Sequence, residues 1–60
     1  METIFAGYSP ENRPVTFSLD DMGRLWITDT LTGNTERFNE EYYDQDSDIR
    51  FMLIHEGYHN

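Results

Sequence analysis

The sequence contains no cysteine and no lysine. Without cysteine the chain can form neither disulfides nor the thiolate ligands of structural zinc sites. Its longest aliphatic or aromatic run is Phe51–Ile54, far shorter than the ~20 residues that span a bilayer. The sequence has no glycine-rich phosphate loop, and no serine stands in the glycine context of a nucleophile elbow. We therefore expect no nucleophilic catalysis and do not predict an enzyme.

The chain has only 60 residues, which predicts a single small domain over residues 1–60. A chain of this length buries only ~60% of the surface that its unfolded form exposes, so its core is thin. Aromatic residues make up 15% of the sequence, and each can bury a large area. Dimerisation would also add core, so a monomer and a homodimer both remain open.

Twelve carboxylates stand against four arginines, which gives a net charge of -8. This charge excludes direct binding to nucleic acid or to an anionic membrane, because both carry the same sign. It favours a basic partner; the alternative is an acidic surface that serves only solubility. The start Met1-Glu2-Thr3 leads into no apolar run of the signal-peptide type, so we expect a soluble cytoplasmic protein.

The hydrophobic pattern predicts an α+β fold with a small antiparallel sheet. Val15, Phe17 and Leu19 alternate with polar residues, and in the segment from Arg24 to Asp29 Leu25 and Ile27 share one face while Trp26 takes the other; such alternation is typical of half-buried strands. In the segment from Glu2 to Tyr8, Ile4, Ala6 and Tyr8 share one face and Phe5 takes the other. The expected strands, three to four in number, lie at about 2–8, 14–19, 24–29 and 49–55.

Two turns and one helix complete the expected fold. Asp20-Asp21-Met22-Gly23 predicts a hairpin turn, and the sequence from Thr30 to Thr35 predicts a second turn before a short returning strand at 36–38. Asn39 is a good N-cap with Glu40 and Glu41 in the first turn, so we expect one short acidic helix at about 39–45.

The segment 49–55 fits either a buried strand or a helix. Its shortness and its β-branched ends favour a strand. Gly57 argues against a long helix through the C-terminal residues.

His55-Glu56-Gly57-Tyr58-His59 resembles the H-E-x-x-H signature of zincin metalloproteases. The resemblance implies His55 and His59 as zinc ligands and Glu56 as the base. However, Gly57 weakens the helix that the spacing needs, and no third ligand follows. We therefore predict no metal and no cofactor, and keep a zinc-binding protein as the third hypothesis.

Asp44-Gln45-Asp46-Ser47-Asp48 resembles the start of an EF-hand calcium loop. Ile49 stands where that loop needs glycine, and His55 stands where it needs a bidentate glutamate. This segment therefore predicts a solvated acidic bend.

Trp26 lies opposite Leu25 and Ile27 on its strand. We interpret it as half of a two-sided core, or as a residue that docks a helix, in preference to a binding hot spot.

The acidic residues form the candidate binding site. Their carboxylates would pair with the arginines and lysines that otherwise hold phosphates, and Tyr42 and Tyr43 would stack where bases or guanidinium planes otherwise sit. This requires the Asp20-Asp21 turn to lie beside the acidic stretch, which runs from Glu36 to Asp48. The predicted partner-binding residues are Glu36, Glu40, Glu41, Tyr42, Tyr43, Asp44, Asp46, Asp48, Asp20 and Asp21.

In size, charge and lack of cysteine, the whole chain is similar to small phage-encoded inhibitors of the anti-CRISPR and anti-restriction DNA-mimic type. This resemblance is one of composition and involves no shared motif. It implies an inhibitor of host defence that acts in the host cytoplasm. Its target would be the basic channel of a CRISPR effector subunit, a restriction enzyme, a repair enzyme or a polymerase. The alternative is an acidic interaction or regulatory module that docks through an apolar patch or sheet edge, with Trp26, Tyr8 and Tyr58 as hot spots.

Overall fold

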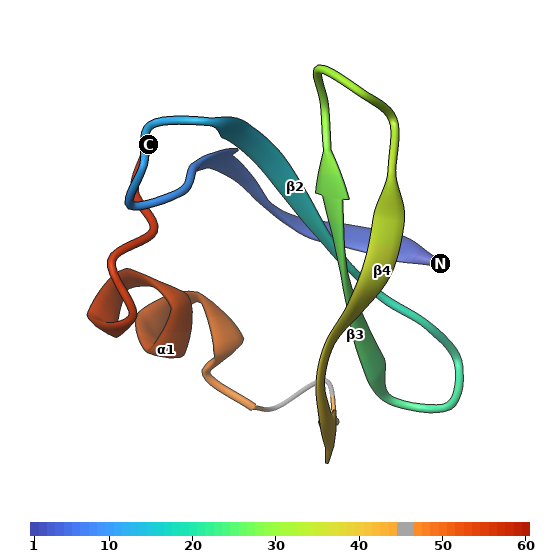
Figure 1. Ribbon diagram of the computed structural model, residues 1–60. Helices are drawn as coiled ribbons and strands as arrows, with labels where there is room; N and C mark the ends of the chain where they lie inside the picture. Colours follow the sequence, from blue (N-terminus) through green and yellow to red (C-terminus); the bar gives the residue numbers. More distant parts are fainter. Residues whose placement is uncertain (45–46) are drawn as a thin grey trace.

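The computed structural model describes residues 1–44 and 47–60. Within these residues, four strands form one antiparallel sheet in the order β1-β2-β3-β4, and a single helix follows them (Figure 1). The expected α+β class is confirmed. The elements are β1 (Glu2–Tyr8), β2 (Pro14–Leu19), β3 (Arg24–Asp29), β4 (Thr35–Tyr42) and α1 (Ile49–His55).

The core lies between α1 and one face of the sheet. Phe17 and Leu25 on the two central strands are fully buried, as is Leu53 on the helix. The alternation of β2 and β3 carries these side chains to one face, because successive side chains of a strand point to opposite sides. Phe17 makes edge contacts with the rings of Phe38 and Tyr58, at centroid distances of 5.2 and 5.0 Å. The predicted hairpin of β2 and β3 is confirmed.

Because of a bulge in β1, the side chains of that strand that face the core differ from those that simple alternation predicts. The register with β2 shifts between Thr3 and Phe5, and an extra residue in one strand re-aims the side chains around it. As a result Phe5 is buried and Ile4 also packs against the core, whereas Ala6 is exposed.

The segment 49–55 is a helix, so the preference for a strand there was wrong. Asp48 caps the helix, because its carboxylate accepts the Phe51 N–H at 3.3 Å. The helix ends in a Schellman arrangement at Gly57, whose φ is 105°. There the Tyr58 N–H donates to the Leu53 carbonyl and the Gly57 N–H to the Ile54 carbonyl, both at 3.0 Å. Gly57 therefore terminates the helix rather than preventing it.

The prediction of an acidic helix at 39–45 was also wrong, since β4 continues through Asn39 to Tyr42. The turn preference of Asn39 is used inside a bulge: its side-chain oxygen accepts the Glu41 N–H at 3.0 Å. The position of Gln45 lies outside the described residues. The short returning strand expected at 36–38 is confirmed as part of β4.

Within residues 1–44 and 47–60, no helix has the length and apolar character needed to cross a membrane.

Candidate partner-binding surface at the acidic end

The β2–β3 turn lies against the segment that follows β4. The Tyr43 N–H donates to the Gly23 carbonyl at 2.7 Å. A Cβ atom on Gly23 would stand 2.5 Å from the Tyr43 carbonyl oxygen, so this contact requires glycine. Both segments lie at the lower end of Figure 1. The Asp20-Asp21 turn therefore lies beside the Tyr43-Asp44 part of the acidic stretch.

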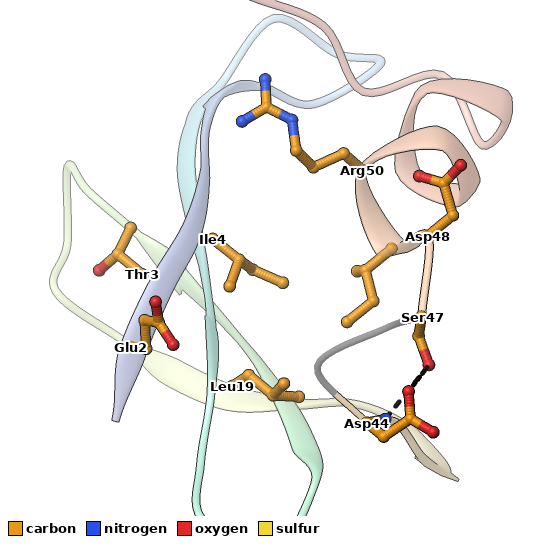
Figure 2. Close-up of a pocket in the computed structure, with 9 residues that line it drawn as sticks. Glu2, Thr3, Ile4, Leu19, Asp44, Ser47, Asp48 and Arg50 are labelled. Carbon is orange, nitrogen blue, oxygen red and sulfur yellow. Dashed lines mark hydrogen bonds between the residues drawn. The ribbon is translucent and has the colours of Figure 1, made fainter.

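Two shallow clefts run along this end of the molecule. The first has a volume of ≈ 400 Å³ and is lined by Glu2, Asp20, Asp21 and Asp44 around Leu19 and Tyr43, among others. The second, of ≈ 500 Å³, shares Glu2, Leu19 and Asp44 and extends to Asp48 and Arg50 (Figure 2). Its apolar lining comes from Ile4, Leu19 and Ile49. We refer to the five carboxylates of these clefts as the acidic end: Glu2, Asp20, Asp21, Asp44 and Asp48.

The carboxylate of Asp20 is held by groups of the chain itself. Its Oδ1 accepts hydrogen bonds from the backbone N–H groups of Met22 and Arg24. Its Oδ2 accepts hydrogen bonds from Arg24 Nε and Trp26 Nε1, and all four donor–acceptor distances lie between 2.7 and 3.0 Å. Desolvation alone would raise the pKa of Asp20. The hydrogen bonds from the Trp26 indole, from Arg24 and from Met22 outweigh it and hold the pKa well below its ordinary value. Asp20 therefore shapes the turn, whereas Asp21 is exposed to solvent.

The carboxylates before the helix have local roles as well. Asp48 is the N-cap of α1. The Ser47 hydroxyl donates to Asp44 Oδ1 at 3.1 Å and accepts the Asp44 N–H at 3.2 Å. The predicted site residue Asp46 lies outside the described residues. Of the expected acidic bend, the described residues Asp44, Ser47 and Asp48 thus make local hydrogen bonds that lead into the helix cap.

Glu40 and Glu41 project from β4 into solvent. Trp26 pairs with Arg37 and Arg24 pairs with Tyr42, so a long bulge in β4 lies between the two pairs. Both glutamates sit in this bulge and are exposed. A bulge in an edge strand re-aims side chains and interrupts the edge.

The two tyrosines after the bulge differ in availability. Tyr42 is 67% exposed, and the centroid of its ring lies 5.2 Å from the guanidinium carbon of Arg37. Tyr43 is half-buried against the core, and its hydroxyl accepts the Asn39 side-chain amide at 2.7 Å. Of the predicted pair, Tyr42 is the residue that a partner can reach.

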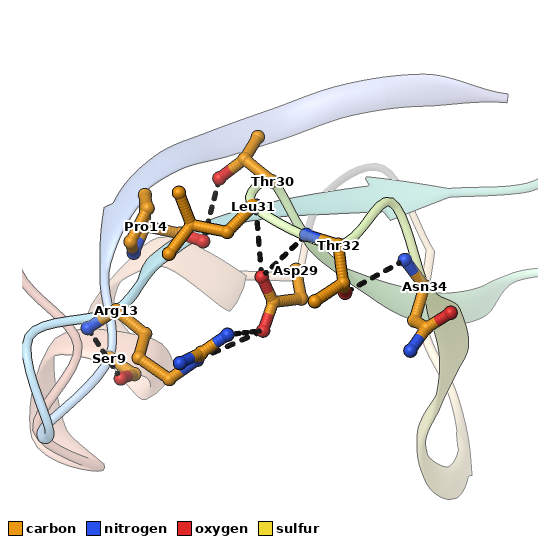
Figure 3. A network of polar contacts seen from close by, with 8 residues as sticks. All are labelled: Ser9, Arg13, Pro14, Asp29, Thr30, Leu31, Thr32 and Asn34. Atoms are coloured by element: carbon orange, nitrogen blue, oxygen red, sulfur yellow. Dashed lines mark hydrogen bonds and ion pairs between the residues drawn. The ribbon is translucent and has the colours of Figure 1, made fainter.

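Glu36 lies away from the other predicted residues. It lines a third cleft, of ≈ 320 Å³, together with Arg13 and Asp29. The Arg13 guanidinium donates to Asp29 at 2.7 Å (Figure 3). This hydrogen bond is the main reason that the pKa of Asp29 lies below its ordinary value. Figure 3 shows that the same carboxylate also orders the β3–β4 turn, since its Oδ1 accepts the Leu31 and Thr32 N–H groups.

The H-E-x-x-H string does not form the helical zinc site that its spacing implies. The helix ends at His55, and Gly57 turns the chain away. His59 forms a β-bridge with Tyr8, and the two rings stack at a centroid distance of 5.9 Å. In the part of the chain that the structure describes, no three His, Asp or Glu side chains are grouped as a metal would require.

Trp26 lies on the sheet face opposite α1, so its interpretation as a core or helix-docking residue was wrong. Its direct cross-strand partners are Ser18 and Arg37, and it is half-buried. The reason is that α1 is the only helix in residues 1–44 and 47–60, and it covers the face of Phe17 and Leu25. Among the other proposed hot spots, Tyr58 packs on Phe17 and Phe38, and Tyr8 is 45% exposed.

Sequence reasoning missed Glu2 as a member of the acidic end. The antiparallel pairing of β1 with β2 places Glu2 opposite Leu19, directly before the Asp20 turn. The signal was present, because an antiparallel hairpin of two segments of this length brings the start of the first beside the end of the second.

Comparison with protein-family models gave no match, and neither did comparison with curated proteins or with solved structures.

Proposed function

We propose that the protein is an acidic inhibitor that mimics nucleic acid and occupies the positively charged DNA- or RNA-binding channel of a target protein. The inhibitor is of the anti-CRISPR or anti-restriction type, and its target is a CRISPR effector subunit or another nucleic-acid enzyme of host defence. The observation that carries the proposal is the junction of the acidic β2–β3 turn with Tyr43-Asp44, which gathers carboxylates from three separate segments.

Little of the negative charge is neutralised within the fold. In the described ranges, two ion pairs engage Asp29 with Arg13 and Asp20 with Arg24. Asp21, Glu40 and Glu41 have no ion pair there and are exposed. Such carboxylates attract a basic surface over a Debye length of ~10 Å at 0.1 M salt and steer its approach.

The second cleft suits the side chains that line a nucleic-acid channel. Arginine and lysine carry apolar stems behind their charged heads and bury those stems along apolar surface. Ile4, Leu19 and Ile49 provide apolar lining, and the charged lining residues are three carboxylates against one guanidinium: Glu2, Asp44, Asp48 and Arg50. Arginine pairs with carboxylates in two-pronged geometry, as it does with phosphates.

The test requires a charge change that leaves the fold intact. Glu40→Gln with Glu41→Gln removes two exposed charges and changes the net charge from -8 to -6. The control, Glu11→Gln with Glu56→Gln, makes the same change at exposed positions outside the predicted site. The measurement is how strongly each variant inhibits, at low salt, the binding of DNA to candidate CRISPR effectors and restriction enzymes.

We expect the Glu40/Glu41 variant to inhibit at least about tenfold less well and the control variant to inhibit like the wild type, since two close charge pairs are lost only in the first. Equal inhibition by both variants would show that net charge, and not this surface, determines binding. Full inhibition by a folded variant that also carries Glu2→Gln and Asp21→Asn would refute the proposal.

The second candidate function is an acidic interaction or regulatory module. The observation that favours it is the uncovered sheet face around Trp26. Its partner contact would persist at high salt, whereas that of a nucleic-acid mimic would weaken steeply.

A further inference from the structure

The sheet face opposite α1 is a second surface of different chemistry. Along β2, β3 and β4 it presents polar or aromatic residues at alternate positions, and none of them is buried. The cross-strand pairs Trp26–Arg37 and Arg24–Tyr42 lie at its centre, next to threonines and Ser18. We define the Trp26 face by these residues: Thr16, Ser18, Arg24, Trp26, Thr28, Arg37 and Tyr42.

The composition of the Trp26 face is that of a binding surface. It holds the only tryptophan and two of the four arginines of a chain with net charge -8. Tryptophan, tyrosine and arginine are the residue types most enriched in binding hot spots. Here all three types stand within two adjacent cross-strand pairs.

The two arginines of this face differ in what they still can bind. The charge of Arg24 is compensated by Asp20, at 2.7 Å. Arg37 lies over the Tyr42 ring and donates one hydrogen bond, of 3.3 Å, to the Glu41 carbonyl. Within residues 1–44 and 47–60 it has no ion pair, and its buried Nε has no hydrogen-bond partner. Since a guanidinium has five N–H donors, Arg37 is the cation of this face that is held in place but not neutralised.

We infer that the Trp26 face binds an extended segment of a partner protein in which a carboxylate stands next to an aromatic or aliphatic side chain. The carboxylate pairs with Arg37, and the apolar neighbour packs on the Trp26 ring. Charge complementarity selects this occupant, because Arg37 is the only unneutralised charge among the side chains that define the face. A nucleic-acid strand is disfavoured as the occupant. The twelve carboxylates of the chain repel its many phosphates more strongly than they repel the single acidic side chain of a peptide.

The experiment presents the wild-type protein with a displayed library of random heptapeptides. Peptides that emerge are synthesised, and their binding is followed by the fluorescence of Trp26, which is the single tryptophan of the chain. We expect enrichment of Asp or Glu next to an aromatic or aliphatic residue. A library that yields no enrichment, or only basic peptides, would overturn the inference.

The enriched peptide is then measured on Arg37→Gln, which removes the charge and keeps a polar side chain. We expect its affinity to fall about 10-fold to 100-fold, as for the loss of a charge-assisted hydrogen bond. Glu40→Gln with Glu41→Gln should bind the peptide with wild-type affinity or better. Unchanged binding to Arg37→Gln would refute the role of this residue, and tighter binding of a single-stranded oligonucleotide than of the peptide would refute the assignment of the occupant.

This inference and the proposed function can fail separately. Arg37→Gln should retain inhibition of a nucleic-acid enzyme, because it removes no carboxylate of the acidic end and neither Glu40 nor Glu41; the contact with this segment that it loses by hydrogen bonding is the single 3.3 Å bond to the Glu41 carbonyl. Loss of inhibition in that variant would mean that the two surfaces are one site, and would overturn the inference of a separate partner segment.

Discussion

Gly23→Ala is the change that most sharply tests how the acidic end is assembled. Gly23 has a φ of 85°, and a residue with a Cβ atom loses about 1–2 kcal/mol in this left-handed region. The new Cβ would also stand 2.5 Å from the Tyr43 carbonyl oxygen. Tyr43 must then move and weaken its 2.7 Å hydrogen bond to the Gly23 carbonyl, a loss of about 0.5–1.5 kcal/mol. The two effects together predict a destabilisation of about 1.5–3.5 kcal/mol.

Gly33→Ala is a matched control for the backbone effect alone. Gly33 has a φ of 80° in the β3–β4 turn, and a Cβ atom added there would meet nothing within 4 Å beyond its own chain neighbours. We therefore expect only about 1–2 kcal/mol of destabilisation from the strained backbone. The assay is urea denaturation followed by Trp26 fluorescence, with the free energy of unfolding compared among the wild type and both variants. Equal losses in the two variants would refute the close contact between the turn and Tyr43.

Two further substitutions test the turn and the core. Because hydrogen bonds hold the folded-state pKa of Asp20 below the ordinary 3.8, its ionised carboxylate stabilises the fold above that pH, and the contribution is lost as the pH falls below it. Asp20→Asn should therefore be less stable than the wild type at pH 7 in urea denaturation, and the difference should shrink below about pH 3.8; a difference independent of pH would contradict this role. Leu53→Ala should cost about 2–5 kcal/mol, because Leu53 is fully buried. Ile54→Ala, at a position 55% exposed on the same helix, should change the free energy of unfolding by less than about 0.5 kcal/mol. If calorimetry showed similar losses of stability in Leu53→Ala and Ile54→Ala, α1 would pack on the sheet in a different way.

The central hairpin was predictable because its signals are local and agree with one another. Val15, Phe17 and Leu19 alternate cleanly, and Gly23 supplies the positive φ that the turn requires. Where local signals compete, the prediction failed. Asn39 is a good helix N-cap and also a good turn former, and pairing of β4 with β3 decided between the two.

At the C-terminal end, the signals for a helix and for a strand compete. Gly57 disfavours a helix that runs through it, but glycine is also the usual residue just beyond a helix. Asp48 before an apolar run, with Ile49 and Leu53 four positions apart, is the sequence signal for α1. The β-branched ends of the segment favour a strand, and tertiary packing overrides that preference, because Ile49 and Leu53 are both buried against the sheet.

The candidate site was predictable only in part, since its assembly depends on contacts between distant segments. The sequence identified Asp21, Glu40 and Glu41 as charged and solvated, and they are exposed. It could not indicate that Asp20 is held by Trp26 and Arg24, because that depends on the geometry of the turn. Nor could it place Trp26 on the uncovered face, because that depends on which side of the sheet the helix occupies.

The measurement that tests the central claim most directly is the salt dependence of target binding, with duplex DNA as competitor. The tagged protein captures a nucleic-acid enzyme from bacterial lysate at low salt, and the dissociation constant of the purified pair is then measured across salt concentrations. The account predicts that affinity falls steeply with salt, that DNA releases the enzyme, and that Glu40→Gln with Glu41→Gln weakens the complex. A complex that persists at high salt, is indifferent to DNA and is unchanged in this variant would contradict it.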